Sequence, residues 1–136
     1  GEFAYVVRKG ATPLAVGERA YIGGSMTDGA AIVEGIAEAP ETLNSAPHGS
    51  GRVMSRSQAK GNRKGTRQGL VSEEMMAAAV AEAGIELRGG DRDESPFVYR
   101  PLDPVLAAHP NVRVVHRLHS LGVSMAPRHI RDPYKD

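Results

Sequence analysis

The sequence predicts an α+β fold with mixed or antiparallel strands and two or more short helices. Three observations lead to this prediction: short apolar runs separated by glycine and proline up to residue 36, an amphipathic segment after Ser72, and partial alternation of apolar and polar residues over 112–125. The 136 residues are enough for one domain, or for part of one. With two Phe and no Trp, its core must consist mainly of aliphatic side chains.

Three apolar runs in the N-terminal part, at residues 4–7, 14–16 and 30–33, are too short for helices. Gly10, Gly17 and Gly29 lie between or beside these runs, and glycine is typical of tight loops. We therefore expect three strands joined by tight loops in this part of the chain.

One helix is expected after Ser72, which can act as an N-cap because two glutamates follow it in the first turn. Met75, Met76 and Val80 recur on one helical face and are therefore candidates for the core. Gly84 is suited to end this helix.

A second, short helix is expected over residues 105–108, because Asp103 and Pro104 resemble a helix start and Pro110 limits its length. The alternation over residues 112–125 predicts a final strand region. We expect residues 1–126 to belong to one domain and residues 127–136 to form a tail.

The charge is balanced overall but not locally. The 17 Lys and Arg against 16 Asp and Glu give a net charge of +1, which excludes a globally basic nucleic-acid coat and an acidic disordered tail. Residues 42–72 contain no acidic residue, and within them lies a basic loop, residues 52–67. A solvated loop commonly explains such a run, while the missing acids favour a polyanion partner. The six cations are Arg52, Arg56, Lys60, Arg63, Lys64 and Arg67.

The densest candidate site is the loop formed by residues 44–56. His48 is followed by Gly49 and Gly51, so backbone N–H groups beside the imidazole could approach a phosphate, and Arg52 could neutralise its oxygens. The alternative is a flexible polar loop with an exposed histidine. The loop lacks the spacing of a Walker A motif.

Two other segments leave alternatives open. Residues 23–26, Gly-Gly-Ser-Met, could form a second backbone cradle for an anion or an ordinary glycine-rich turn. Arg8 and Lys9 precede a glycine and could form a cationic turn or a nucleic-acid contact.

Some chemistries are excluded or disfavoured. The absence of cysteine excludes a thiol nucleophile and every cysteine-based metal site in this chain. No histidine pair has the spacing of a helical zinc motif, and alternation would place His116 and His119 on opposite faces of a strand, so we expect no metal ligands here. No apolar run reaches the length of a membrane span, and we expect a cytoplasmic protein with no membrane partner.

Four strings occur in the order in which the RtcB-type RNA ligase family carries similar motifs. The chain resembles the C-terminal part of such a ligase from about residue 6 to residue 125. The strings are Arg-Lys-Gly-Ala-Thr at 8–12, Gly-Gly-Ser-Met at 23–26, His-Gly-Ser-Gly-Arg-Val-Met-Ser-Arg at 48–56, and Arg-Leu-His-Ser-Leu-Gly-Val at 117–123.

This resemblance implies the activity of an RNA ligase that uses GTP and Mn²⁺. His48 matches the family histidine that attacks the α-phosphate of GTP and forms a histidine–GMP intermediate. The guanylyl group then passes to an RNA 3′-phosphate, and a 5′-hydroxyl displaces GMP. The resemblance implies that the ends joined are an RNA 3′-phosphate or 2′,3′-cyclic phosphate and a 5′-hydroxyl. The implied process is tRNA splicing or RNA repair.

The resemblance also implies which residues contact the nucleotide and the RNA. Met125 stands where the family carries a lysine that contacts the guanine nucleotide, and Ala30 stands where it carries a serine. The positions matching nucleotide contacts are Gly23, Gly24, Ser25, Met26, Ala30, His48, Gly49, Ser50, Gly51, Tyr99 and Met125. The expected RNA or phosphate contacts are Arg8, Lys9, Arg52, Arg56, Arg63 and Lys64.

The family's Mn²⁺ ligands lie upstream of the region that the resemblance covers. The resemblance therefore implies that an upstream part of the ligase supplies the metal site and is a partner of this chain. A second hypothesis, from a different class, is a non-catalytic RNA-binding or interaction module derived from the same fold.

Overall fold

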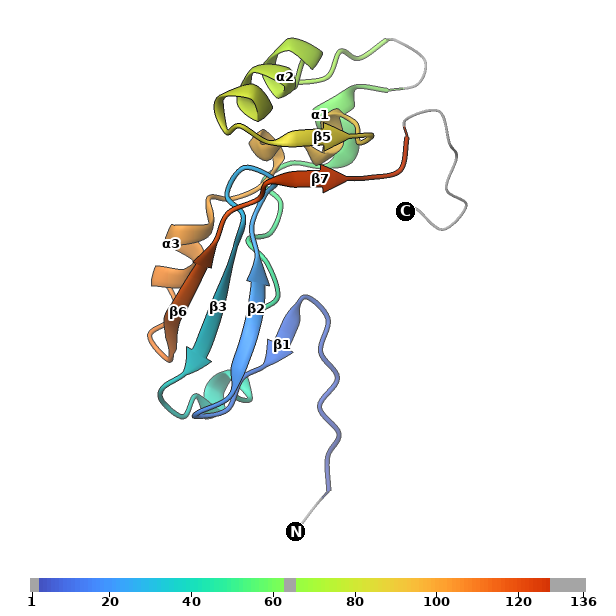
Figure 1. Ribbon diagram of the computed structural model, residues 1–136. Helices are drawn as coiled ribbons and strands as arrows, with labels where there is room; N and C mark the ends of the chain where they lie inside the picture. The colour runs from blue at the N-terminus through green and yellow to red at the C-terminus, as the bar shows by residue number, and fades with distance from the viewer. Residues whose placement is uncertain (1–2, 63–65, 128–136) are drawn as a thin grey trace.

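A computed structural model describes residues 3–62 and 66–127. A three-stranded antiparallel sheet forms its centre, in the order β2 (Arg19–Gly23), β3 (Ala30–Gly35) and β6 (Val112–Leu118). Figure 1 shows this sheet below a second group of elements that contains α1, α2, β5 and β7. The α+β fold expected from the sequence is confirmed.

Two small strand pairs complete the strands of the described residues. β1 (Ala11–Pro13) pairs antiparallel with β4 (Ser45–Pro47), and β5 (Glu86–Arg88) pairs parallel with β7 (Gly122–Ser124). The helices and 3₁₀ turns are η1 (Pro40–Thr42), α1 (Arg56–Lys60), α2 (Glu73–Glu82), η2 (Arg92–Glu94), η3 (Pro96–Val98) and α3 (Leu102–Ala107).

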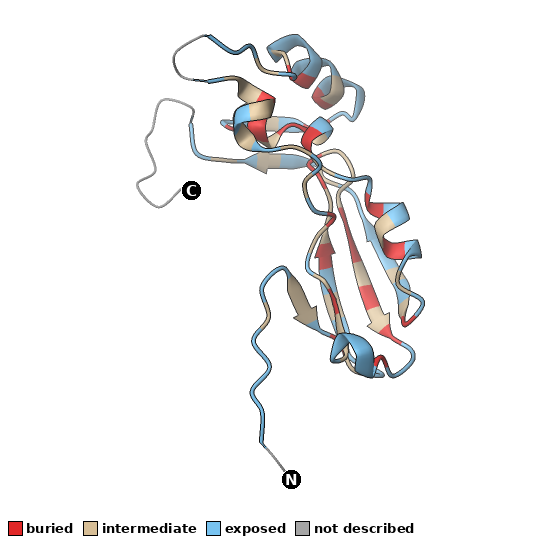
Figure 2. Cartoon of the chain, turned by 180° about the vertical axis from the view of Figure 1, so that it is seen from behind, coloured by how far each residue is buried: buried red, intermediate tan, exposed pale blue. Residues whose placement is uncertain are grey.

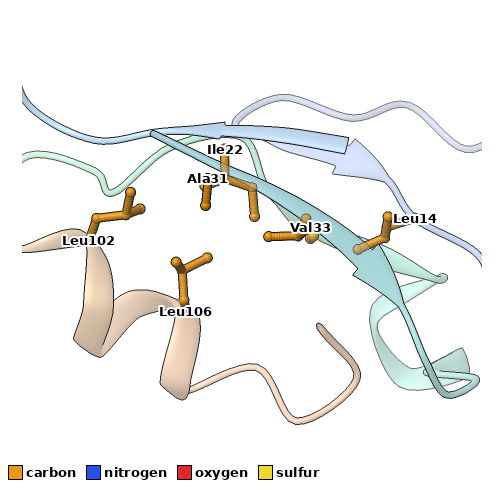
Figure 3. Packing of buried hydrophobic residues seen from close by; sticks show 7 residues of the cluster. Leu14, Ile22, Ala31, Val33, Leu102 and Leu106 are labelled. Carbon is orange, nitrogen blue, oxygen red and sulfur yellow. The ribbon is translucent and has the colours of Figure 1, made fainter. Parts of the chain in front are cut away.

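The main hydrophobic core lies between α3 and one face of the sheet. Leu102 and Leu106 of α3 point toward Ile22, Ala31 and Val33 (Figure 3). Figure 2 shows the buried positions along the central strand β3, which has a partner strand on each side. Each fully buried aliphatic side chain stabilises the fold by about 1.5–3 kcal/mol, so this cluster fixes α3 against the sheet.

Two smaller apolar clusters lie outside this core. Met76 and Val80 of α2 pack with Met26 and Ile85. Ala59, Val71 and Val98 form the other cluster. These two clusters are built by α1, α2, the η3 turn and the loops around them, rather than by the three-stranded sheet.

The helix after Ser72 begins as expected, because the Ser72 hydroxyl accepts a hydrogen bond from the Met75 N–H at 3.1 Å. Gly84 follows the helix with a φ of 65°, which explains why the chain turns there. Met75 was expected in the core, but its side chain is 40% exposed. The face that α2 buries is therefore narrower than the sequence pattern indicated.

The N-terminal strand prediction is wrong. Residues 4–7 form no strand, and Tyr5 and Val7 are more than nine-tenths exposed, because no described segment pairs with them. The expected strand at 14–16 is displaced to β1, while Leu14 is fully buried and donates its N–H to Asn44.

The C-terminal predictions need smaller corrections. α3 begins at Leu102 rather than after Pro104 and ends at Ala107. The strand region expected over 112–125 consists of β6 and β7, which pair with different partners. No helix among the described residues is long and apolar enough to cross a membrane. The expected tail, residues 127–136, lies outside the described residues apart from its first residue.

We predict that Gly29→Ala strongly destabilises the fold. Gly29 has a φ of 72°, and a Cβ atom there would overlap the Leu118 carbonyl oxygen of β6. We expect the free energy of unfolding to fall by about 3 kcal/mol, measured by urea denaturation.

Gly17→Ala is the matched control, because Gly17 has a φ of 80° but open space around its Cβ position. It should cost only about 1–2 kcal/mol for the left-handed backbone. Equal losses in the two variants would contradict the close approach of Gly29 to β6.

Candidate active site

His48 directly follows β4, and its backbone is held from two sides. Its N–H donates to the Gly10 carbonyl oxygen at 3.3 Å, and its carbonyl oxygen accepts from the Gly23 N–H at 3.2 Å. The imidazole is exposed and lies over Gly10, where a Cβ atom would come 3.9 Å from Nε2. The backbone is thus fixed while the ring remains accessible to a reactant.

The two glycine-rich segments lie side by side, at the end of β2 and after β4. Gly49 forms a parallel bridge with Gly23, and the Ser50 N–H donates to the Gly23 carbonyl oxygen at 2.9 Å. A Cβ atom on Gly49 would lie 3.1 Å from that oxygen, so a small residue permits this approach. Gly51 has a φ of 76°. The structure therefore brings together two segments that the sequence singled out separately.

The backbone groups of Gly23 and Gly24 are already engaged within the protein. The Gly23 N–H donates to His48, and the Gly24 N–H donates to the Gly29 carbonyl oxygen at 2.8 Å. These two N–H groups are therefore not open to an anion in this structure. They instead hold the turn beside His48.

The remaining residues of this turn are buried. The Ser25 hydroxyl accepts from the Asp28 N–H at 3.3 Å and lies 3.3 Å from the Thr27 hydroxyl, while Met26 packs in the apolar cluster of α2. Ala30 is buried and pairs with Gly23 across the β2–β3 register. These side chains shape the turn from within.

Ser50 carries a polar group that stands out in this loop. Its side chain is buried, and its hydroxyl has no hydrogen-bond partner among the described residues. Buried hydroxyl groups are usually hydrogen-bonded, so an unpaired one two positions after His48 is a candidate contact for a bound group.

Arg52 fixes the C-terminal part of the loop formed by residues 44–56, which we call the His48 loop. Its Nη1 donates to the Tyr99 hydroxyl at 3.2 Å, its Nη2 to the Asp93 carbonyl oxygen at 2.7 Å, and its Nε to the Met54 carbonyl oxygen at 3.2 Å. The guanidinium also lies over the Tyr99 ring, 5.2 Å from its centre. These hydrogen bonds join Arg52 to Asp93 and Tyr99, which lie 41 and 47 positions further along the chain.

The resemblance places Tyr99 near the nucleotide. In the structure its hydroxyl is hydrogen-bonded, and one face of its ring lies against the Arg52 guanidinium. Its hydroxyl donates to Glu94 Oε2 at 2.6 Å. Burial raises the pKa of Tyr99, and the Glu94 carboxylate raises it further, so the hydroxyl keeps its proton and donates. The side chain of Tyr99 thus contacts both Glu94 and Arg52.

A cluster of carboxylates neutralises the first part of the segment expected to be a basic loop, of which residues 56–60 instead form the helix α1. Asp93 is fully buried and lies 2.9 Å from Arg56 Nη1 and 3.3 Å from Lys60 Nζ. Arg56 also pairs with Glu94, and Lys60 lies 3.3 Å from Asp91. The hydrogen bond to Asp93 raises the pKa of Arg56, although burial opposes this.

Although residues 42–72 contain no acid, three of the six cations, Arg52, Arg56 and Lys60, therefore have carboxylate partners. The acids lie at residues 91–94, after the acid-free stretch of residues 42–72. Arg63 and Lys64 lie outside the described residues.

The other predicted site residues lie in two places. Arg8 donates to the Ser45 hydroxyl at 2.8 Å and to the Leu43 carbonyl oxygen at 3.0 Å, and the neighbouring Lys9 is exposed. Met125 packs with Val123 against the apolar cluster around Met26, and no described contact joins it to His48.

Sequence reasoning missed Arg100, which lies against the His48 loop. Its N–H donates to the Gly51 carbonyl oxygen at 2.9 Å, and its Nη1 to the Arg52 carbonyl oxygen at 3.1 Å. It also missed the acids at 91–94. The sequence shows three acidic residues within positions 91–94, which could have indicated a site of ion pairing. Only the tertiary structure shows which cations these acids contact.

The described residues contain no group of three or more His, Cys, Asp or Glu side chains placed to hold a metal ion. They therefore do not fit a Mn²⁺ site by themselves.

Comparison with known proteins identifies the family. Residues 1–126 match the family described as tRNA-splicing ligase RtcB, and the chain belongs to this family. The RNA-splicing ligase RtcB of Escherichia coli K12 is 37% identical over 119 residues, which are 87% of this chain and 27% of that relative. The family to which the four motifs pointed is thus confirmed.

Two further relatives have similar coverage. The tRNA-splicing ligase RtcB of Aeropyrum pernix is 35% identical over 116 residues, 80% of this chain and 22% of the relative. The RNA-splicing ligase RtcB of Mycobacterium tuberculosis is 35% identical over 115 residues, which are 79% of this chain and 24% of that relative. The chain thus spans about a quarter of the length of these relatives.

We predict that Asp93→Asn lowers the free energy of unfolding by about 3 kcal/mol, because it leaves Arg56 and Lys60 without their shared buried carboxylate. Glu86→Gln is the control, since the Glu86–Arg88 pair is largely exposed and should contribute less than about 1 kcal/mol. Urea denaturation measures both variants. Similar small losses would show that the buried cluster does not stabilise the fold.

Proposed function

We propose that this chain is the nucleophile-bearing part of an RNA ligase that joins an RNA 3′-phosphate or 2′,3′-cyclic phosphate to a 5′-hydroxyl, in tRNA splicing or RNA repair. The observation that carries the proposal is His48, an exposed imidazole on a fixed backbone within the family's His-Gly-Ser-Gly-Arg string. The family membership supports the reaction class.

In the proposed reaction, an unprotonated ring nitrogen of His48 forms a bond to the α-phosphorus of GTP while the bond to pyrophosphate breaks. The guanylyl group then passes to the RNA 3′-phosphate, and the 5′-hydroxyl displaces GMP as the strands are joined. The exposure of the imidazole supports the attack, because the ring nitrogen must reach the phosphorus in line with the leaving group.

The neighbouring residues have supporting roles in this proposal. Gly49 and Gly51 let the loop approach Gly23 closely, and the unpaired Ser50 hydroxyl can donate to a phosphate oxygen. Tyr99 acts through Arg52, which it helps to orient. Met26, Ala30 and Met125 would affect the nucleotide only through the packing around it.

The proposed RNA contacts divide into two classes. Arg52 and Arg56 are held by carboxylates and so chiefly position the loop, whereas Arg8 and Lys9 have no carboxylate partner among the described residues. Arg8 and Lys9 are therefore the better candidates to contact phosphate. The proposed contacts by Arg63 and Lys64 fall outside the described residues.

Mn²⁺ dependence requires ligands beyond the described residues of this chain, because these residues form no cluster of metal donors. We propose that an upstream part of the ligase supplies them, and we derive no step through the metal from this chain's residues.

We predict that His48→Ala abolishes guanylylation. The assay joins this chain to the upstream three-quarters of the E. coli relative and measures the protein mass after incubation with GTP and Mn²⁺. His119→Ala is the control, because His119 is also exposed but lies after β6. Wild type and His119→Ala should gain one guanylyl group, and His48→Ala should gain none.

Labelling that survives in His48→Ala would show that another residue is the nucleophile. If the wild-type fusion also fails to label, the proposed ligase activity is wrong and a non-catalytic RNA-binding or interaction module becomes the better account.

A further inference from the structure

Helix α3 covers one face of the three-stranded sheet, namely the face that carries Ile22, Ala31 and Val33 (Figure 3). Successive residues of a strand point to opposite faces, so Tyr21 and Ile32 point away from α3. None of the three apolar clusters of the described residues includes either of these two side chains. We call the surface around Tyr21 and Ile32 the open face of the sheet.

The middle of the open face is largely apolar. Tyr21 pairs with Ile32 across β2 and β3, and Ile32 pairs with His116 of β6. Tyr21 is 59% exposed, and Leu118, which pairs with Ala30 in the next row of this face, is 40% exposed. A sheet face that stays in water is commonly polar, so these aromatic and aliphatic residues indicate a surface that another polypeptide covers.

A charged row borders this apolar middle. Arg19 and Arg113 lie on either side of Glu34, at 3.9 Å and 3.2 Å from its carboxylate, and their side chains are 62% and 61% exposed. An apolar centre with a polar, solvent-accessible border is the usual anatomy of a protein–protein interface. Because the two cations share one carboxylate, the row suits a partner that brings acidic groups to this border.

The other end of the open face adjoins the His48 loop. A Cβ atom on Gly23 would lie 3.5 Å from Tyr21 Cε1, so the Tyr21 ring lies beside Gly23. The backbone of Gly23 is in turn hydrogen-bonded to His48 and Ser50. A polypeptide seated on the open face therefore reaches the edge of the candidate active site.

The length of the relatives indicates which polypeptide this is. The matched region is 27% of the E. coli K12 relative, so most of that ligase lies outside it. The described residues of this chain form no cluster of metal donors, and the proposed function places those donors in an upstream part of the ligase. Such a part must lie beside His48, and the open face is an apolar surface that ends there.

We propose that the open face of the sheet is the docking surface for the upstream part of the ligase. That part lays apolar side chains over Tyr21, Ile32 and Leu118, and this position brings it beside His48. The inference rests on the proposed function, because that function supplies the occupant. Its test needs neither GTP nor a metal ion, so the two proposals can fail independently.

The first test measures how well the open face is protected. Because the chain contains no cysteine, Tyr21→Cys introduces a single thiol into it. Alkylation by N-ethylmaleimide is followed by peptide mass in the isolated chain and in the fusion to the upstream three-quarters of the E. coli relative. Ala77→Cys is the matched control, because Ala77 is exposed on α2. In the fusion we expect the rate for Tyr21→Cys to fall about tenfold or more, and the rate for Ala77→Cys to change less than about twofold.

The second test uses the isolated chain and compares two isoleucines on opposite faces of the sheet. Ile22 is fully buried, so Ile22→Thr should lower the urea midpoint of unfolding by about a third. Ile32→Thr should lower this midpoint by less than about a tenth, because Ile32 belongs to no apolar cluster of the described residues. Equal losses in the two variants would show that the open face is already packed within this chain and would overturn the proposal.

The remaining outcomes separate the two proposals. Equal alkylation of Tyr21→Cys in the isolated chain and the fusion overturns the docking surface, and so does equal protection of Tyr21→Cys and Ala77→Cys. If protection in the isolated chain rises with its concentration, a second copy covers the open face and the proposal is also wrong. Guanylylation of a fusion that leaves Tyr21→Cys reactive refutes the docking surface alone, whereas protection without guanylylation refutes the ligase activity alone.

Discussion

The pairing of carboxylates at 91–94 with cations at 52–60 is the interaction on which the site depends. Asp93 is fully buried, and it is compensated by Arg56 and Lys60. Arg52 links this cluster to the loop that carries His48, because it also bonds the Asp93 carbonyl oxygen and the Tyr99 hydroxyl. Breaking one partner would leave a buried charge uncompensated, so the carboxylates and the loop must be ordered together.

This ion pairing separates the basic residues into two groups with different roles. Those nearest the carboxylates fix the backbone after His48, while Arg8, Lys9 and Arg100 have no carboxylate partner among the described residues. The loop is therefore held from the side of Tyr99, and the positive charge open to a polyanion lies on the side of α3 and β1. A count of charges along the sequence cannot separate these two groups, because it treats every cation as an equal candidate to contact a polyanion.

Local patterns were sufficient where neighbours in sequence determine the structure. Ser72 and Gly84 mark the ends of α2 because capping and the left-handed turn involve only nearby backbone groups. The family strings also placed His48 and Gly23 in one site. The sequence could not show that residues 4–7 lack a partner strand, or that Asp93 faces Arg56, because both depend on contacts between distant segments.

The most direct test of the central claim is amide hydrogen exchange in Glu94→Gln, which removes the charge beside Arg52 and Arg56 but keeps an oxygen for Tyr99. The account predicts about tenfold faster exchange at the Ser50 and Val53 amides, equivalent to about 1.4 kcal/mol of lost local stability, with unchanged exchange at Ile22 in β2. Unchanged exchange at Ser50 and Val53 would contradict it, because the loop would then be held without the carboxylates.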